Sequence, residues 1–258
     1  MTPKEKSTAL LLAAVLLLSS CQTHGPDLPH RNRTASNNLP KIILWAWERP
    51  EDFEFLDPER FGVAFLAQTL VIEGDTIRFQ PRRQPLKVSP KTKLIAVTRI
   101  ESTKTTGKKA NLGPSQRSEL VALIHRTLDL ENVAAVQVDF DVVQSEREAY
   151  RALLEELRQR LPVNVGLSMT ALASFCIGDR WLRDMPVDEA VPMIFRMGTD
   201  NDVIKSLLAR GKDFGEPLCR SSYGIALDEP LKMEFDSARR LYVFNNHAWT
   251  KDDILRFQ

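Results

Sequence analysis

The sequence has few cysteines, no long apolar run and almost no net charge, and each shortage excludes a class of protein. Three cysteines among 258 residues are too few for a disulfide-dense scaffold. The longest apolar run, residues 9–18, is about half the ~20 residues that a membrane-spanning helix needs, so a polytopic membrane protein is excluded. A net charge of +1 argues against a general nucleic-acid binder, which needs a basic excess to neutralise phosphates.

Motifs for cofactors and for common catalytic machinery are also missing. Glycine is sparse, at 11 residues, and neither a Gly-x-Gly-x-x-Gly fingerprint nor a Walker loop occurs. There is no Gly-x-Ser-x-Gly nucleophile elbow. The four histidines lack the spacing of metal ligands. We therefore expect no metal and no other cofactor.

The first 20 residues have the pattern of a secretory leader. Lys4 and Lys6 precede the apolar run, which is too short for a transmembrane helix but right for a signal-peptide core. The run ends in Leu18-Ser19-Ser20-Cys21, which resembles the bacterial lipobox, where cleavage precedes a cysteine that is then lipidated. We therefore expect residues 1–20 to be removed and Cys21 to anchor the chain to a membrane. The alternative is an ordinary secretory signal followed by a chance cysteine.

A polar tether follows the leader. Residues 21–40 contain three Pro, three Asn, one Gly and one Ser and have little apolar periodicity. Gln22, rather than aspartate, follows the cysteine, which by resemblance to lipoprotein sorting rules favours the outer membrane, facing the periplasm. The leader contains Lys4, Glu5 and Lys6, so the remaining chain has 33 basic and 33 acidic residues and is formally neutral.

Residues 41–258 alternate between strand and helix patterns, which predicts parallel βαβ units. Strands are expected at residues 42–47, 62–66, 70–72, 76–79, 94–100, 133–140, 163–169, 191–197, 223–227 and 240–244. Helices are expected at residues 115–128, 145–161, near Trp181, and at 202–209 and 251–257. The predicted fold is a compact α/β (β/α)8 barrel of the TIM type, with an open doubly wound sheet as the alternative.

One predicted strand has an apolar face and an acidic face. Val136, Val138 and Phe140 alternate with Gln137, Asp139 and Asp141, and alternate side chains of a strand point to opposite faces. In a barrel, the polar set would point inward and rise toward the C-terminal mouth, where active sites of this fold lie. Two neighbouring carboxylates would also shift each other's pKa values. The alternative is an edge strand with one solvated face.

The same strand resembles the fourth strand of the family-18 chitinases, whose motif is two aspartates and then a glutamate, each two residues apart. Asp139 and Asp141 match the aspartates, but Val143 stands where that family has its acid, the glutamate. Residues 167–170 and 193–196 resemble the next two strands, except that Phe195 and Arg196 replace a usual tyrosine and aspartate.

A resemblance to the bacterial family called domain of unknown function 3142 covers most of the chain after the tether. It is carried by residues 45–50, 137–141, 167–173, 178–182, 191–198 and 224–230. This resemblance implies a secreted or lipid-anchored protein with a glycosidase-like barrel, and it implies no established activity.

Further candidates for the mouth come from the ends of other strands. Trp45 and Trp47 share one face of the first strand, and Glu48 follows it; an exposed tryptophan near carboxylates is a usual platform for sugar rings, with core packing as the alternative. Trp181 is a second possible sugar contact. Arg99 and Glu101 share one face and are either an ion pair or ligand contacts.

The later strands contribute charged candidates. Arg196 is either a counter-ion of the aspartates or a substrate contact. Asp228 and Glu229 follow the seventh strand, where several retaining glycosidases place a second carboxylate; the alternative is that they cap a turn before Pro230. Asp141 as acid and Glu229 as nucleophile is the resulting catalytic pair, with Asp139 as a third catalytic candidate.

Two cysteines remain once Cys21 is assigned to the lipid. In an oxidising compartment Cys176 and Cys219 are expected to form a disulfide, with two free buried thiols as the alternative. The sequence thus predicts a monomeric, lipid-anchored envelope protein whose barrel acts on or binds a glycan through carboxylates at its mouth. The alternative function is a non-catalytic glycan-binding or envelope interaction protein.

Overall fold

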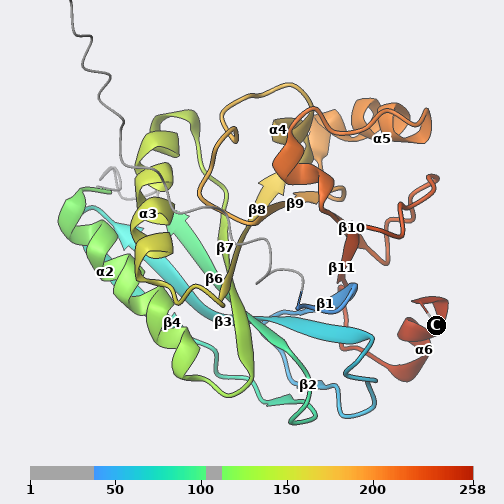
Figure 1. Ribbon diagram of the computed structural model, residues 1–258, viewed down its shortest axis with the longest axis horizontal. Coiled ribbons are helices and arrows are strands. Elements are labelled where there is room, and N and C mark those ends of the chain that lie inside the picture. Colours follow the sequence, from blue (N-terminus) through green and yellow to red (C-terminus); the bar gives the residue numbers. More distant parts are fainter. Residues whose placement is uncertain (1–37, 103–111, 258) are drawn as a thin grey trace, which may run out of the picture. The chain divides into compact units, whose positions relative to one another are not determined.

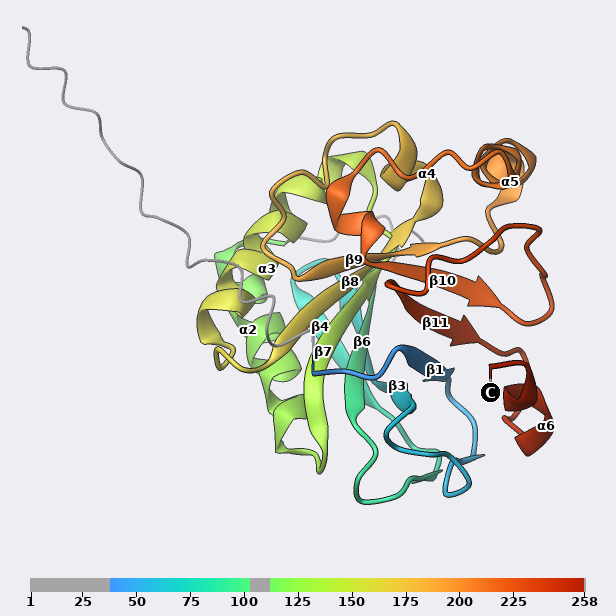
Figure 2. The ribbon, with the colours of Figure 1, turned by 45° about the vertical axis from the view of Figure 1, so that its right-hand side comes forward.

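The computed structural model describes residues 38–102 and 112–257, which form a closed parallel barrel (Figures 1 and 2). Its eight strands are β1 (Ile42–Ala46), β3 (Phe61–Glu73), β6 (Leu94–Ser102), β7 (Val133–Phe140), β8 (Gly166–Leu172), β9 (Glu189–Met193), β10 (Ser222–Ala226) and β11 (Arg240–Phe244). They pair in that order, all in parallel, and β11 closes onto β1. The expected (β/α)8 class is confirmed, and the open doubly wound sheet is excluded.

Helices cover the barrel unevenly. They are α2 (Pro114–His125), α3 (Arg147–Arg160), α4 (Ala173–Ile177), α5 (Asn201–Ala209) and α6 (Lys251–Ile254). Short 3-10 turns accompany them: η1 (Arg126–Asp129), η2 (Gln144–Glu146), η3 (Gly198–Asp200), η4 (Pro217–Arg220) and η5 (Leu255–Phe257). Among the described residues, no helix joins β1 to β3, β3 to β6 or β10 to β11. The helix expected near Trp181 ends earlier, at Ile177, and Trp181 lies in a turn.

The second strand is longer than the sequence predicts. The strands expected at 62–66 and 70–72 form one strand, β3, whose register against β6 shifts between Leu66 and Gln68. The polar Gln68 and Thr69 interrupt the apolar pattern, which is why two short strands were expected. The predicted hairpin is present, since β4 (Thr76–Pro81) pairs antiparallel with the distal part of β3. A separate two-stranded sheet joins β2 (Glu51–Asp52) to β5 (Leu86–Lys87).

The alternation of side chains divides the buried residues into an interior and an exterior cluster. On β7, Val136, Val138 and Phe140 belong to the large cluster between the barrel and its helices, as predicted. Trp45 and Phe195 belong to a smaller cluster inside the barrel. Helices α2 and α3 lie side by side over the outside of the barrel (Figures 1 and 2), with Ser118 Oγ donating to Glu156 Oε1 at 2.6 Å.

A buried ion pair fills the N-terminal end of the barrel. Arg240 Nη1 donates to both carboxylate oxygens of Glu189, at 2.8 and 3.0 Å, and Tyr242 Oη donates to the same carboxylate at 2.6 Å. Because these groups satisfy one another, the charges can remain buried. The barrel is therefore filled at this end, and its accessible interior lies at the other end.

The folded domain begins slightly before the predicted boundary. Leu39 is buried in the interior cluster, and the carbonyl of Pro40 accepts a hydrogen bond from Arg240 Nε. These two residues, assigned to the tether from the sequence, therefore belong to the barrel. The predicted leader and Cys21 lie outside the described residues.

A disulfide links two of the connecting segments. Cys176, in α4, is bonded to Cys219, in η4, across a sequence separation of 43 residues. Both side chains are fully buried. The bond ties the segment after β8 to the segment before β10.

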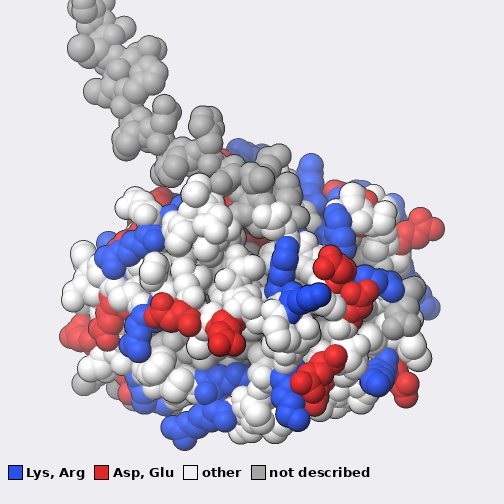
Figure 3. Space-filling view, turned by 60° about the horizontal axis from the view of Figure 1, so that its bottom comes forward, with Lys and Arg blue, Asp and Glu red and all other residues white. Residues whose placement is uncertain are grey.

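The surface shows no segregation of charge on the face drawn in Figure 3, where basic and acidic side chains are interspersed. This distribution fits the nearly equal numbers of basic and acidic residues, 35 and 34 in the whole chain. Over the ranges 38–102 and 112–257, no helix is long and apolar enough to cross a membrane.

Candidate functional site

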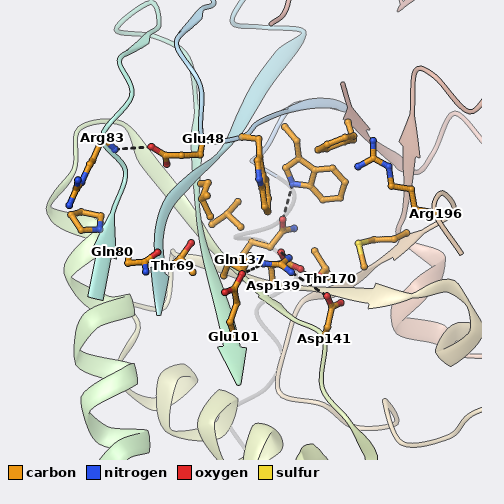
Figure 4. A pocket seen from close by; sticks show the side chains of 18 of the residues that line it. Glu48, Thr69, Gln80, Arg83, Glu101, Gln137, Asp139, Asp141, Thr170 and Arg196 are labelled. Atoms are coloured by element: carbon orange, nitrogen blue, oxygen red, sulfur yellow. Dashed lines mark hydrogen bonds and ion pairs between the residues drawn. The ribbon is translucent and has the colours of Figure 1, made fainter. Parts of the chain in front are cut away.

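A cavity of about 1040 Å³ opens at the C-terminal ends of the barrel strands (Figure 4). Its walls come from seven of the eight barrel strands and from β4. The residues that line it are Trp45, Trp47, Glu48, Leu66, Thr69, Arg78, Phe79, Gln80, Pro81, Arg83, Val97, Arg99, Glu101, Gln137, Asp139, Asp141, Thr170, Leu172, Met193, Phe195, Arg196 and Phe244. Its volume is at the upper end of the ~300–1000 Å³ of small-molecule sites, which leaves room for a ligand of more than one ring.

Three carboxylates converge on one guanidinium at the floor of the cavity (Figure 4). Arg99 Nη1 donates to Asp139 Oδ2 at 2.8 Å, and Arg99 Nε donates to Glu101 Oε1 at 2.9 Å. Arg99 Nη2 lies 3.4 Å from Asp141 Oδ2. β6 and β7 are neighbours, and their register places Arg99 opposite Asp139, which is why these side chains meet. Arg99 and Glu101 are thus both an ion pair and part of the cavity wall.

Asp139 is the buried member of this group. Its side chain is 7% exposed, whereas those of Asp141 and Glu101 are 55% and 47% exposed. Burial raises the pKa of the Asp139 carboxyl, and the charge of Asp141 acts in the same direction. The charge of Arg99 and the hydrogen bond from Thr170 Oγ1, at 2.7 Å, oppose this rise in pKa without cancelling it.

Gln137 lies one step deeper on the same face of β7. Its Oε1 accepts a hydrogen bond from Trp45 Nε1 at 3.0 Å, and its Nε2 donates to Ser168 Oγ at 3.1 Å. The side chain is completely buried. Gln137 therefore fixes the floor of the cavity and holds Trp45, which packs in the interior cluster. β7 lies between β6 and β8, so the edge-strand alternative is excluded.

Aromatic rings form one wall. Trp47 is half-buried and meets Phe244 edge to face, with ring centroids 6.4 Å apart. Phe244 stacks on Phe195 at 5.5 Å. The guanidinium of Arg99 lies 5.7 Å from the centre of the Trp47 ring, so the aromatic wall and the carboxylate group are in direct contact.

The β3–β4 hairpin forms a second wall. Phe79, on β4, is 45% exposed although its side chain is large and apolar, and it lines the cavity. Glu48 accepts a hydrogen bond from the backbone N–H of Arg83 at 3.0 Å, which joins the end of β1 to the segment after β4 (Figure 4).

The structure separates Asp228 and Glu229 from the carboxylate group. Neither lines the cavity. Glu229 accepts hydrogen bonds from the backbone N–H of Arg196, at 3.1 and 3.3 Å, and from Lys205 Nζ at 3.3 Å. Asp228 accepts a hydrogen bond from Asn246 Nδ2 at 2.9 Å. Of Arg196, Lys205, Asp228 and Glu229, only Arg196 lines the cavity. Among the described residues, its guanidinium is paired with Asp228 and makes no ion pair with Asp139 or Asp141.

Trp181 also lies away from the cavity. Its ring meets Phe175 edge to face at 5.4 Å and lies 6.4 Å from the ring of Tyr150. The guanidinium of Arg147 covers it at 5.0 Å. These contacts make Trp181 part of the packing between α3 and α4 instead of a wall of the cavity.

Sequence reasoning missed several lining residues. Thr170, which orients Asp139, is the clearest case, and its signal is the polar alternation of Ser168 and Thr170 on β8. Phe79, Gln80 and Arg83 carried no comparable signal, because only the packing of the hairpin brings them to the mouth. Within the described residues, no group of three His, Cys, Asp or Glu side chains is arranged to hold a metal ion.

No family model matches the sequence, and no curated protein matches it either. The resemblances noted from the sequence therefore remain resemblances. Among solved structures, the chain is similar to the spore cortex-lytic enzyme SleL of Bacillus cereus, with 15% sequence identity and a TM-score of 0.45. The similarity covers 73% of this chain and 51% of SleL, so the chain matches about half the length of that protein.

Proposed function

We propose that the cavity at the barrel mouth binds a glycan. The observation that carries this proposal is the presence of partly exposed aromatic rings and partly exposed carboxylates in one cavity of about 1040 Å³. A sugar ring has apolar C–H faces and a rim of hydroxyl groups. Trp47 and Phe79 offer surfaces for the apolar C–H faces, and the carboxylates offer acceptors for the hydroxyl groups.

The carboxylates keep capacity for a ligand. An ionised carboxylate has about four lone-pair sites. Asp141 is more than half exposed and has one long contact with Arg99, at 3.4 Å. Glu101 is nearly half exposed and is bonded to Arg99 through one oxygen at 2.9 Å. Both side chains can therefore accept hydrogen bonds from sugar hydroxyls without breaking their contacts with Arg99.

The binding proposal is tested with a glycan array and the purified chain. We expect Trp47→Ala to weaken binding of the retained glycan by about 1 kcal/mol, because it removes a stacking surface. Trp181→Ala is the matched control, since it removes the same side chain outside the cavity. Equal binding by the parent and Trp47→Ala would contradict the proposal, provided that circular dichroism shows both to be folded.

Hydrolysis of a glycosidic bond is the second candidate function, and the arrangement around Arg99 favours it. Asp141 and Glu101 contact nitrogens of the same guanidinium, at 3.4 and 2.9 Å, so their nearest oxygens lie no farther apart than the ~9.5 Å upper limit of inverting glycosidases. The pair that the geometry supports is therefore Asp141 with Glu101. Glu229, the partner expected from the sequence, lies off the cavity. Asp139 would position Arg99 and adjust the charge at Asp141.

The hydrolysis candidate is tested on whichever glycan the array identifies. Asp141→Asn and Glu101→Gln should each lower turnover by about 10²–10⁴-fold if the two carboxylates act as acid and base. Both variants should still bind the glycan. If the parent chain binds the glycan but does not turn it over, the result supports the glycan-binding function and contradicts hydrolysis.

We further propose that the barrel is held in the cell envelope by a lipid on Cys21, at the outer membrane facing the periplasm. The support is the leader pattern and the cysteine at its end. A lipid at the start of a polar tether would leave the domain free to reach a glycan near the membrane.

A further inference from the structure

Arg196 has a strained backbone at the rim of the cavity. Its φ is +52°, in the left-handed region that residues with a side chain rarely adopt. It follows β9, and its side chain lines the cavity. Such strain persists only where surrounding contacts enforce it, and it gathers at ligand sites.

Glu229 contacts the backbone of Arg196 in this conformation. Both oxygens of its carboxylate accept from the backbone N–H of Arg196, at 3.1 and 3.3 Å. Lys205 Nζ, 3.3 Å from the same carboxylate, compensates its charge. Glu229 therefore holds the backbone of Arg196 and leaves its guanidinium to the cavity.

The Arg196 guanidinium is fixed in place but poorly paired. It lies 4.9 Å from the centre of the Phe244 ring, which orients its plane. Its nearest acid is Asp228, at 3.7 Å, too long for a strong hydrogen bond, and its side chain is 54% exposed. In the part of the chain that the structure describes, the guanidinium makes no other hydrogen bond or ion pair. Its donors are free to bind an anion bidentately.

The cavity is polarised. The carboxylate group of Asp139, Asp141 and Glu101 holds three acids on one arginine, whereas Arg196 lies apart from it and on the opposite side from Glu48 (Figure 4). An acidic group on a ligand would be repelled by the first region and attracted by the second. Arg78 and Arg83 also line the cavity, on the hairpin wall, where Arg78 is paired with Glu73 at 3.1 Å and the backbone of Arg83 is bonded to Glu48. An acidic sugar with its carboxylate at Arg196 would direct its hydroxyls toward Asp141.

We propose that Arg196 is the specificity-determining residue for a carboxylate-bearing sugar, and that Glu229 is its positioning residue. This inference rests on the proposed function, since it names the class of glycan that the same cavity takes. Glu229 thus has a role in the site without touching the ligand.

The test compares acidic oligosaccharides with the same molecules after reduction of their carboxyl groups to alcohols. The probes are fragments of pectate, alginate and hyaluronan, and the measurement is the dissociation constant by calorimetry with the full chain. We expect the parent to bind at least one acidic fragment on the order of ten-fold more tightly than its reduced form. Arg196→Gln should remove this preference, because it weakens binding of the acidic fragment more than binding of the reduced fragment. Arg196→Lys should keep part of it, because the charge remains and the bidentate geometry is lost.

Two further variants separate the proposal from simpler effects. Glu229→Ala removes the acceptor of the Arg196 N–H and should lower the preference for the acidic fragment more than it lowers the affinity for the reduced fragment, which a purely structural role would not do. Arg210→Gln removes one exposed charge at the end of α5 and should change neither affinity. Equal losses in Arg210→Gln and Arg196→Gln would overturn the assignment.

The outcomes also separate this inference from the proposed function. If acidic and reduced fragments bind the parent equally well, the role of Arg196 is wrong and glycan binding stands. If glycans on the array bind but no acidic fragment does, the role of Arg196 is likewise wrong and glycan binding stands. If neither the array nor these fragments yield a ligand, the proposed function fails and this inference fails with it.

Discussion

Asp139 combines two opposite influences on one carboxyl group. Its burial disfavours the charged form, while Arg99 and Thr170 favour it, and the balance leaves its pKa above the usual value of 3.8. The folded protein therefore binds a proton at Asp139 more tightly than the unfolded chain does. This difference links the stability of the fold to pH through a residue of the candidate site.

The sign of that link follows from proton binding. Over the pH range from 3.8 to the raised pKa, the folded state holds a proton on Asp139 that the unfolded state has lost. The contribution of Asp139 to the free energy of unfolding is therefore present below pH 3.8 and is lost as pH rises through the folded-state pKa. The side chain of Asp139→Asn cannot ionise. We therefore expect the free energy of unfolding of the parent to fall relative to that of this variant as pH rises across that range.

Urea unfolding at a series of pH values measures the difference. The variant keeps one acceptor oxygen, which can accept from Arg99, and its amide nitrogen can donate to Thr170 Oγ1, so it should remain folded. Asp179→Asn is the matched control, because the side chain of this aspartate is 34% exposed and lies outside the cavity. A stability difference that stays constant with pH, or that shifts in favour of the parent, would contradict the account of Asp139.

The residues of β7 were the most predictable part of the site. Alternation places Asp139 on the inner face and Phe140 on the outer one, whatever the rest of the chain does. The partners of these residues were less predictable, because they depend on register. Arg99 meets Asp139 because β6 and β7 pair at that position, and the sequence alone did not reveal the offset between them. The partner of Glu229 was equally hard to predict from the sequence, because the turn after β10 directs its side chain to the backbone of Arg196.

At the scale of elements, β3 and β4 depart furthest from a regular βα unit. A regular barrel strand ends at the mouth, but β3 continues to Glu73 and returns as β4. The hairpin thus raises one wall of the cavity where the described connection between β3 and β6 has no helix. The sequence predicted the hairpin from its turn, residues 73–75, but not its role as a wall.

The disulfide between α4 and η4 should be a major source of stability. The loop-entropy account gives about 4 kcal/mol for a bond that closes a loop of 43 residues. We expect the double variant Cys176→Ala, Cys219→Ala to lose roughly this amount of unfolding free energy in urea. Both sulfur atoms are buried, so part of the loss will come from the space they leave.

Reduced parent protein separates the two contributions. It keeps the volume of both cysteines and lacks only the bond, so it should lie between the oxidised parent and the double variant. Mass spectrometry after alkylation verifies that the bond is open. If the oxidised and the fully reduced parent unfold at the same urea concentration, the bond does not stabilise the fold.

On the scale of the whole molecule, the chain divides between the barrel and what precedes it. The barrel starts at Leu39, because this residue packs inside it and Pro40 contacts Arg240. Everything that the sequence predicts about location lies before that point, in the leader and the tether. The candidate site and the proposed placement in the envelope can therefore be tested separately.

The last prediction concerns the membrane. If Cys21 is lipidated, its acyl chains provide the anchor, since each buried CH₂ contributes about 0.8 kcal/mol and two chains suffice for stable attachment. Cys21→Ala should move the chain from the membrane fraction to the soluble fraction of cells that process lipoproteins, while its glycan binding stays unchanged. Ser20→Ala is the matched control, because it keeps a small residue before the cysteine and should stay in the membrane fraction. Metabolic labelling with a fatty-acid analogue should mark the parent and Ser20→Ala but not Cys21→Ala. Persistence of Cys21→Ala in washed membranes would mean that the chain is held there by something other than a lipid on this cysteine.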